Sequence, residues 1–317
     1  MQGDLDALLQ NRGFFEMAEI TAKMVADLRA KTAAGMMDCK KALMQTEGDF
    51  EKAVDWLREK GLAAAAKKAS RVAAEGRVHA VLREGAKLGA LVEVNCETDF
   101  VAKGDDFKGI CETVANTVLD KNPADVEALK AELGTLITEA VARIGENIQV
   151  RRFARYEVNG GGRVHSYIHG DGRVGVLIEM TTACECEGET LKNLGQELAL
   201  QLASMKAKFV RRDQVPAAEI EHEREIYRAQ LINEGKKPEI AEKAANGRVE
   251  KFYKEVCLLD QEWVKDSAKN IATLIKETGK ACGCEITVTQ FARWEKGEGI
   301  EKRVDDFAAE VAKQAGL

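Results

Sequence analysis

The sequence has little proline and few aromatic residues, and it contains no long hydrophobic run. Only 3 of its 317 residues are proline and 5% are aromatic, while 32% are charged and 45% are hydrophobic. No apolar run approaches the roughly 18 residues that a membrane span requires. This composition is typical of a helix-rich globular protein of two or three domains. It argues against the disordered, collagen-like and disulfide-scaffold classes.

A surplus of basic residues is also missing. The 47 Lys and Arg residues are outnumbered by 53 Asp and Glu residues, which gives a net charge of -6. A protein that binds nucleic acid through its phosphates usually carries an excess of positive charge. The first ten residues are acidic and lack the basic leader and apolar block of a secretory signal. We therefore predict a cytoplasmic protein with no direct nucleic-acid contact and no membrane contact.

The residue patterns of catalytic sites are scarce as well. The chain has 4 histidines, and two of them, His79 and His165, occupy equivalent positions of an internal repeat, which favours a structural role. We find no phosphate-binding or dinucleotide-binding glycine motif and no Gly-x-Ser-x-Gly nucleophile motif. We predict that the protein is not an enzyme and needs no cofactor.

The 8 cysteines are expected to be mostly reduced thiols in a cytoplasmic chain. Two Cys-x-Cys pairs, Cys184 with Cys186 and Cys282 with Cys284, could supply four thiolates to zinc. Their one-residue spacing is tighter than the usual two to four residues, and their flanks lack the glycine turn of a zinc knuckle. We favour reduced cysteines at strand ends and predict no metal site.

An internal repeat in the middle of the chain is its most informative feature. Gly-Arg-Val-His at 76–79 recurs at 162–165, an offset of 86 residues, and the match continues without a gap through Glu93 and Glu179. Each copy has the alternation of a β-hairpin followed by a helix. The predicted elements are strands 78–82 and 88–94 around Gly85 with helix 106–120, and strands 164–168 and 174–180 around Gly170–Gly172 with helix 189–210.

A second correspondence closes each copy and reveals an insertion. Residues 148–157 match 286–295 at an offset of 138, and 138 minus 86 leaves about 52 additional residues in copy two. The inserted segment, 211–262, contains 22 charged residues, with apolar residues at three-and-four spacing on either side of a break at 235–238. This pattern predicts an antiparallel coiled-coil hairpin. The alternative is a solvated pair of charged helices without a partner. We expect the next helix to begin near Trp263.

The N-terminal part has the pattern of three short helices. Asp38 and Asp49 are expected to cap the second and third, and the third is expected to end at Gly61. Such a small bundle most often serves as a binding module.

These patterns together predict an α+β fold with antiparallel sheets built from a duplicated hairpin-and-helix core. The predicted parts are an extension or fusion remnant (1–16), a three-helix module (17–61), a helical connector (62–75), core unit one (76–158), core unit two (159–210 and 263–296), the coiled-coil insertion (211–262) and a C-terminal helical module (297–317) with a helix from Asp305 to Gln314.

The segment after the first hairpin differs between the two copies. Asp99 and Phe100 occupy positions where copy two has Glu185 and Cys186, although a core position should stay apolar in both. One interpretation is an exposed aromatic wedge for a partner's pocket. The alternative is that Asp99 caps the following helix and Phe100 folds back against it.

Five segments together resemble the translation elongation factor Ts family. The resemblance runs from Met17 to the C-terminus. It departs from the family in residues 1–16 and at Ala33, where glycine is common. The segments are Thr98–Val101, Thr32–Leu43, Gly145–Ile148, Ser166–Gly170 and Gly297–Lys302.

The resemblance implies a guanine-nucleotide exchange factor for the GTPase elongation factor Tu. It would bind the GDP form, disturb the magnesium and phosphate site, and promote GDP release in translation elongation. The N-terminal module would be UBA-like, and the coiled coil leaves a homodimer open. The implied partner-binding residues are Asp99 and Phe100 with Thr98 and Val101 as the wedge, Arg29, Met36 and Met37 in the first module, and His169 and Gly170 in core unit two. The alternative function is a coiled-coil scaffold or chaperone-like binding protein.

Overall fold

The computed structural model describes residues 20–32, 34–184, 186 and 188–301. These described residues form two compact units, one that runs up to residue 71 and includes 135–147, and one that comprises 72–134 and the residues from 148 onward. Helices combine with antiparallel sheets, which confirms the α+β prediction. The predicted extension 1–16 and the predicted helix 305–314 lie outside the described residues.

The first unit is helical. Its buried core contains Leu28, Cys39, Leu43 and Ala53. The helices are α2 (Ala22–Thr32), α3 (Met36–Gln45), α4 (Phe50–Lys68) and α8 (Leu136–Ile144). The likeness to a UBA domain stays a prediction.

The helix ends in this unit partly follow the sequence prediction. Asp49 caps α4 as predicted, since its carboxylate accepts a hydrogen bond from the Lys52 amide at 3.1 Å. Asp38 does not cap α3, because Gly35 occupies that position and Asp38 lies in the first turn. Helix α4 also continues past Gly61, through the alanine-rich stretch that follows it, because alanine favours helix.

The second unit contains two three-stranded antiparallel sheets that share one pattern. Val78 lies opposite Glu93, and the repeat-related Val164 lies opposite Glu179, with a register shift directly after each glutamate. The predicted hairpins are therefore confirmed, and the two copies of the repeat share the same strand register. The strands are β1 (Glu75–Arg83), β2 (Leu88–Cys96) and β3 (Gln149–Glu157) in sheet one, and β4 (Gly162–His169), β5 (Val174–Thr182) and β8 (Ile286–Glu295) in sheet two.

The two sheets pack face to face around a small apolar core that includes Val78, Leu91, Val164 and Leu177. Two repeat-related glycines allow this close approach. A Cβ atom at Gly175 would lie 2.2 Å from Val78 Cγ1, and one at Gly89 would lie 2.7 Å from Val164 Cγ1. Both distances are shorter than van der Waals contact, so a side chain at either glycine would force the sheets apart.

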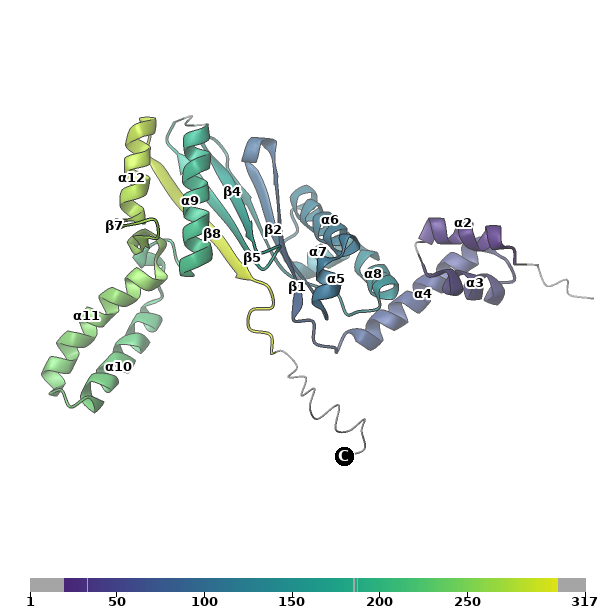
Figure 1. The fold of residues 1–317 in the computed structure, drawn as a ribbon, viewed down its shortest axis with the longest axis horizontal. Coiled ribbons are helices and arrows are strands. Elements are labelled where there is room, and N and C mark those ends of the chain that lie inside the picture. The colour runs from purple at the N-terminus through teal and green to yellow at the C-terminus, as the bar shows by residue number, and fades with distance from the viewer. Residues whose placement is uncertain (1–19, 33, 185, 187, 302–317) are drawn as a thin grey trace, which may run out of the picture. The chain divides into compact units, whose positions relative to one another are not determined.

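Helices cover the outer face of each sheet (Figure 1). The predicted helix 106–120 is confirmed, whereas the predicted helix 189–210 already ends at Met205, because Lys206 adopts a left-handed conformation with φ 53°. Sheet one is covered by α5 (Asp99–Lys103), α6 (Asp105–Lys121) and α7 (Val126–Leu133), and sheet two by α9 (Glu189–Met205) and α12 (Ile271–Cys282).

The insertion forms a helical hairpin of α10 (Ala217–Asn233) and α11 (Pro238–Val256), with the predicted break between them. The two helices lie side by side (Figure 1) and bury Leu231, Ala241 and Ala245. A supercoiled geometry and the homodimer stay predictions. Within the described ranges, 3-10 turns also lie at Glu84–Ala86, Arg212–Gln214 and Leu258–Asp260.

The helix expected near Trp263 begins later. A short hairpin, β6 (Glu262–Trp263) with β7 (Asp266–Asn270), comes first. Helix α12 then begins at Ile271, since the Asn270 side chain accepts a hydrogen bond from the Thr273 amide at 2.9 Å.

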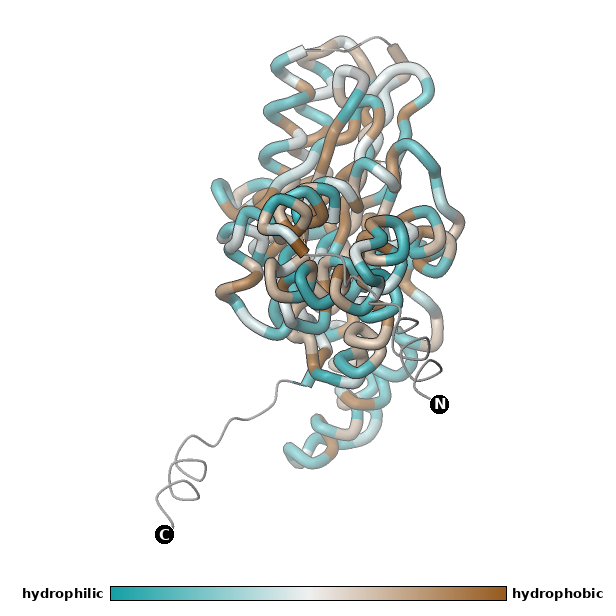
Figure 2. The backbone as a smooth tube through the Cα atoms, turned by 90° about the vertical axis from the view of Figure 1, so that its right-hand side faces the viewer, coloured by the Kyte–Doolittle hydropathy of each residue, from teal (hydrophilic) through white to brown (hydrophobic). Residues whose placement is uncertain are grey.

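The hydropathy of the chain changes over short distances. Figure 2 shows hydrophilic and hydrophobic residues following one another within most segments. Among the described residues, every helix is too short or too polar to cross a membrane.

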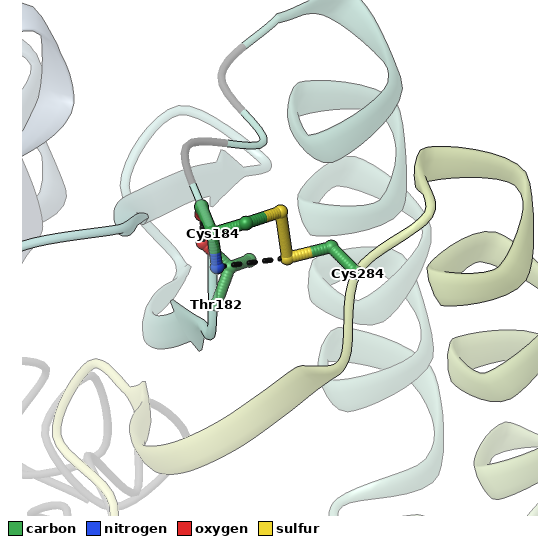
Figure 3. Close-up of a disulfide and its surroundings, with 3 residues drawn as sticks. All are labelled: Thr182, Cys184 and Cys284. Atoms are coloured by element: carbon green, nitrogen blue, oxygen red, sulfur yellow. Dashed lines mark hydrogen bonds between the residues drawn. A yellow bond between two sulfur atoms is a disulfide. The ribbon is translucent and has the colours of Figure 1, made fainter.

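The prediction of reduced cysteines is wrong for one pair, because Cys184 and Cys284 form a disulfide (Figure 3). Strands β5 and β8 place Thr182 opposite Ile286, and the same register continued by two residues brings Cys184 opposite Cys284. Cys186, Cys282 and the other described cysteines are free thiols.

Candidate partner-binding site

The predicted wedge lies on α5, directly after β2. Thr98 caps this short helix, since its Oγ1 accepts a hydrogen bond from the Val101 amide at 3.4 Å. The Phe100 side chain is 85% exposed, while Ala102 on the same helix is buried. The alternative interpretation, in which Asp99 caps the helix and Phe100 folds back, is therefore wrong, and the ring is available to a partner.

The carboxylate of Asp99, next to the Phe100 ring, is stabilised in its ionised form. Lys103 Nζ lies 2.6 Å from Asp99 Oδ2. This hydrogen bond lowers the pKa of Asp99 and raises the pKa of Lys103. Both groups are solvent-exposed, so the ion pair is screened and contributes little to stability. The ion pair nevertheless places one negative and one positive charge next to the exposed Phe100 ring.

Arg77 of β1 connects α5 with the turn between β4 and β5. Its Nη1 donates a hydrogen bond to the Ala102 carbonyl at 3.4 Å, and its Nη2 contacts Asp171 Oδ1 at 2.7 Å. The Val78 amide adds a hydrogen bond to the Gly172 carbonyl at 2.8 Å. The guanidinium is almost fully buried, and its hydrogen bond lowers the pKa of Asp171. The wedge helix and the β4–β5 turn are thus held by one side chain.

That turn carries the second predicted binding segment. His169 ends β4 and Gly170 begins the turn, and both residues are exposed. The Tyr167 hydroxyl and His169 Nδ1 are hydrogen bonded at 2.9 Å. The structure therefore brings the Thr98–Val101 segment and the His169–Gly170 segment into one connected region of the second unit.

The predicted binding residues of the first unit are also on its surface. Met36 and Met37 begin α3 and are 55% and 64% exposed. Arg29 lies on α2 and is exposed. Flexible methionine side chains adapt well to a partner's apolar surface.

Sequence reasoning missed a buried carboxylate that supports this region. Glu93 has no exposed surface and accepts hydrogen bonds from Arg151 Nη1 at 3.0 Å, Arg152 Nε at 2.6 Å, the Gly297 amide at 2.8 Å and Asn95 Nδ2 at 3.2 Å. It joins β2, which leads into the wedge, to β3 and to the segment after β8. The sequence did contain a signal for this buried carboxylate, because a glutamate occupies the same position of a largely apolar strand in both copies of the repeat, as Glu93 and Glu179.

No three of the described His, Cys, Asp and Glu side chains are grouped as ligands for a metal ion. The exposed features of this region, a ring, a charged pair and a histidine-bearing turn, are suited to protein contact.

Comparison with known proteins gives a consistent result. A family model described as "Elongation factor TS" matches residues 97–298. The elongation factor Ts of Symbiobacterium thermophilum is 68% identical over 303 residues, which cover 95% of this chain and 100% of the relative. The elongation factor Ts of Clostridium perfringens is 52% identical over 304 residues, with 94% and 99% covered. That of Clostridium tetani is 49% identical over 304 residues, with 93% and 99% covered.

Proposed function

Because the chain belongs to the elongation factor Ts family, and so to the translation elongation factors, we propose that it is a guanine-nucleotide exchange factor. It binds the GDP form of the GTPase elongation factor Tu and promotes release of GDP. The observation that carries this proposal is the 85% exposed Phe100 ring, held on a capped helix beside a charged Asp99.

Exchange of this kind requires no catalytic side chain. A GTPase holds GDP through magnesium and a loop of backbone amides, and this binding depends on a narrow geometry. Insertion of Asp99 and Phe100 between two helices of the GTPase would stabilise a displaced geometry that binds GDP poorly. The coupling is reciprocal, so GDP weakens the factor's binding by the same factor by which the factor weakens GDP binding.

The binding free energy that one phenylalanine ring can supply shows why further contacts are needed. Burial of a phenylalanine side chain contributes about 2–3 kcal/mol, which corresponds to roughly two orders of magnitude in a conformational equilibrium. We therefore assign additional contacts to the exposed residues of the first unit, Arg29, Met36 and Met37, and to His169 with Gly170.

Release of a fluorescent GDP analogue from elongation factor Tu tests this proposal. The wild-type chain should accelerate release, and Phe100→Ala should slow the accelerated rate by about 30–100-fold. Val264→Ala is the matched control, because Val264 is an exposed apolar residue (46%) in the β6–β7 turn, away from α5. It should leave release unchanged.

The folded state of Phe100→Ala can be checked by its unfolding curve. The exposed ring contributes almost nothing to the free energy of unfolding, so the curve should match the wild type. An intact Phe100→Ala variant that releases GDP at the wild-type rate would refute the wedge.

A further inference from the structure

A groove lies between β8 and α12, at the opposite end of sheet two from the β4–β5 turn. Strand β5 begins at Val174, opposite Glu295, and ends at Thr182, opposite Ile286. The turn therefore lies near the last residues of β8 and the groove lies near the first. Helix α12 packs beside this part of β8 (Figure 1).

The groove follows the edge of β8. Its volume is about 600 Å³, within the range of about 300–1,000 Å³ that is typical of ligand sites. It is lined by residues 285–288 and by the α12 face that carries Ile275, Lys276, Gly279 and Lys280. Successive side chains of a strand point to opposite faces of the sheet, so a lining of four consecutive residues includes the strand's edge. We call this site the β8 edge groove.

The edge of β8 along this groove has no strand partner among the described residues. Sheet two has the strand order β4-β5-β8, so β8 is paired with β5 on one side and is unpaired on the other. An unpaired edge presents a row of backbone N–H and C=O groups to which another strand can be added. Extended peptides bind in this way, with alternate side chains in pockets beside the added strand.

The floor of the groove is apolar. Ile286 and Val288 are 6% and 3% exposed and belong, with Ile275 of α12, to the core of sheet two. Helix and strand are close here, because a Cβ atom at Gly279 would lie 2.7 Å from the Cys284 carbonyl oxygen. Apolar side chains of an added strand would therefore extend an existing core.

The rim of the groove is mainly basic. Lys276 and Lys280 lie one turn apart on α12 and are exposed, and neither has an ion-pair partner among the residues that the structure describes. Arg211 also lines the groove and pairs with Asp213 at 3.0 Å. Glu285 is the acidic residue of the lining. The two unpaired lysines favour an acidic ligand.

The spacing of the lysines matches an extended chain. Four helical residues span about 6 Å along the axis, and residues i and i+2 of a strand are about 6.6 Å apart and point the same way. Helix α12 ends at Cys282 and β8 begins at Ile286, so the two elements run alongside each other. Two acidic residues separated by one residue in an added strand would therefore face Lys276 and Lys280.

We propose that the β8 edge groove binds an extended acidic segment of a partner protein, which joins sheet two as a fourth strand. Backbone hydrogen bonds to β8 supply affinity, and Lys276 and Lys280 select the acidic sequence. A second copy of this chain is a poorer occupant, because pairing of two β8 edges would bring two basic rims together. The proposal does not depend on the exchange activity, since the groove shares no residue with the Thr98–Val101 or His169–Gly170 segment.

The first test measures fluorescence anisotropy with the full-length chain and a fluorescein-labelled peptide, Val-Thr-Glu-Thr-Glu-Thr-Val. Its alternation places both Val and both Glu side chains on one face. The chain should bind this probe at least about tenfold more tightly than the version with Lys at both Glu positions, and higher salt should weaken binding. Absence of binding would overturn the proposal, and the lysines would then only protect the edge from association.

Backbone methylation tests strand addition itself. The N–H groups of alternate residues in an added strand pair with its neighbour. Two probes are therefore N-methylated, one at the odd and one at the even positions. One probe should lose binding and the other should keep it. Equal binding of the two probes would overturn strand addition.

A charge reversal assigns binding to the groove. Lys276→Glu combined with Lys280→Glu should lower affinity for the acidic probe by at least about tenfold, and it should leave the unfolding curve unchanged because both side chains are exposed. Lys236→Glu with Lys237→Glu is the matched control, at two exposed lysines between α10 and α11. It should bind the probe like the wild type. Equal affinities of the two variants would overturn the proposal.

Two further measurements separate this proposal from other outcomes. Sedimentation of the chain alone should show no association that the acidic probe disrupts, since such an association would assign the edge to a second copy and overturn the proposal. GDP release by the variants is measured in parallel, so that a failure of probe binding is distinguished from a failure of the exchange activity.

Discussion

Replacement of Glu93 by glutamine should destabilise the second unit far more than the same replacement at Glu179. The two glutamates occupy equivalent positions of the repeat, on β2 and β5. Glu93 is fully buried and accepts two charged hydrogen bonds from arginines. Glu179 is half-buried and has neutral partners, Thr289 at 2.6 Å and Gln290 at 2.9 Å.

The magnitudes follow from these partners. Loss of one partner of a buried ion pair costs about 3–5 kcal/mol. Arg151 and Arg152 remain 28% and 29% exposed, so water compensates part of the loss, and glutamine still accepts a hydrogen bond. We expect a loss of about 2–3 kcal/mol in the free energy of unfolding for Glu93→Gln. Because the partners of Glu179 are neutral, we expect Glu179→Gln to lower the free energy of unfolding by about 1 kcal/mol or less.

Urea unfolding followed by tryptophan fluorescence measures this difference. Two of the 3 tryptophans, Trp263 and Trp294, belong to the second unit and the third, Trp56, to the first. A Trp56→Phe background therefore confines the signal to the second unit. The slope of free energy against urea should not change, because the exposed surface on unfolding is the same. Equal losses for the two variants would refute the assigned role of the arginine contacts.

Three further predictions concern other contacts of the second unit. Arg77→Met removes the hydrogen bonds to the Ala102 carbonyl and to Asp171. If each hydrogen bond contributes about 1 kcal/mol, the substitution should slow GDP release about 30-fold, and an unchanged rate would contradict the proposed role of Arg77 in holding α5. Burial lowers the pKa of His165 in the folded chain, so stability should decline as pH falls below about 6.5, where the unfolded chain takes up a proton first. His165→Gln should flatten the dependence of the unfolding free energy on pH between about 5 and 7, and a slope equal to that of the wild type would contradict this. Reduction of the Cys184–Cys284 disulfide should lower the unfolding free energy by about 2–5 kcal/mol, because the bond closes a loop of 100 residues. Equal urea midpoints of the oxidised and reduced chains would contradict this prediction.

Local patterns were sufficient for most of the secondary structure. The alternation around Gly85 and around Gly170–Gly172 predicts both hairpins, because strand burial follows a period of two residues. Asp49 predicts the start of α4 through its side chain. The predicted helix starts were wrong where another residue occupies the N-cap position. Gly35 occupies it at α3, and Asn270 occupies it at α12.

Contacts between distant segments could not be predicted in this way. The apolar strand around Glu93 does not reveal that two arginines of β3 and the Gly297 amide converge on this carboxylate. The packing of α8 against α4 in the first unit likewise depends on residues about 75 positions apart. Such contacts form only when long loops close, and local periodicity carries no record of that closure.

The duplicated hairpins and the motif around Asp99 and Phe100 could be identified from local residue patterns, because a repeat or a short motif depends only on residues close together in the chain. The exposure of the Phe100 ring became known from the three-dimensional packing, since exposure depends on which surfaces the other elements cover. The same holds for the disulfide. The register of β5 and β8 brings the sulfurs of Cys184 and Cys284 together although these residues are 100 positions apart in the sequence.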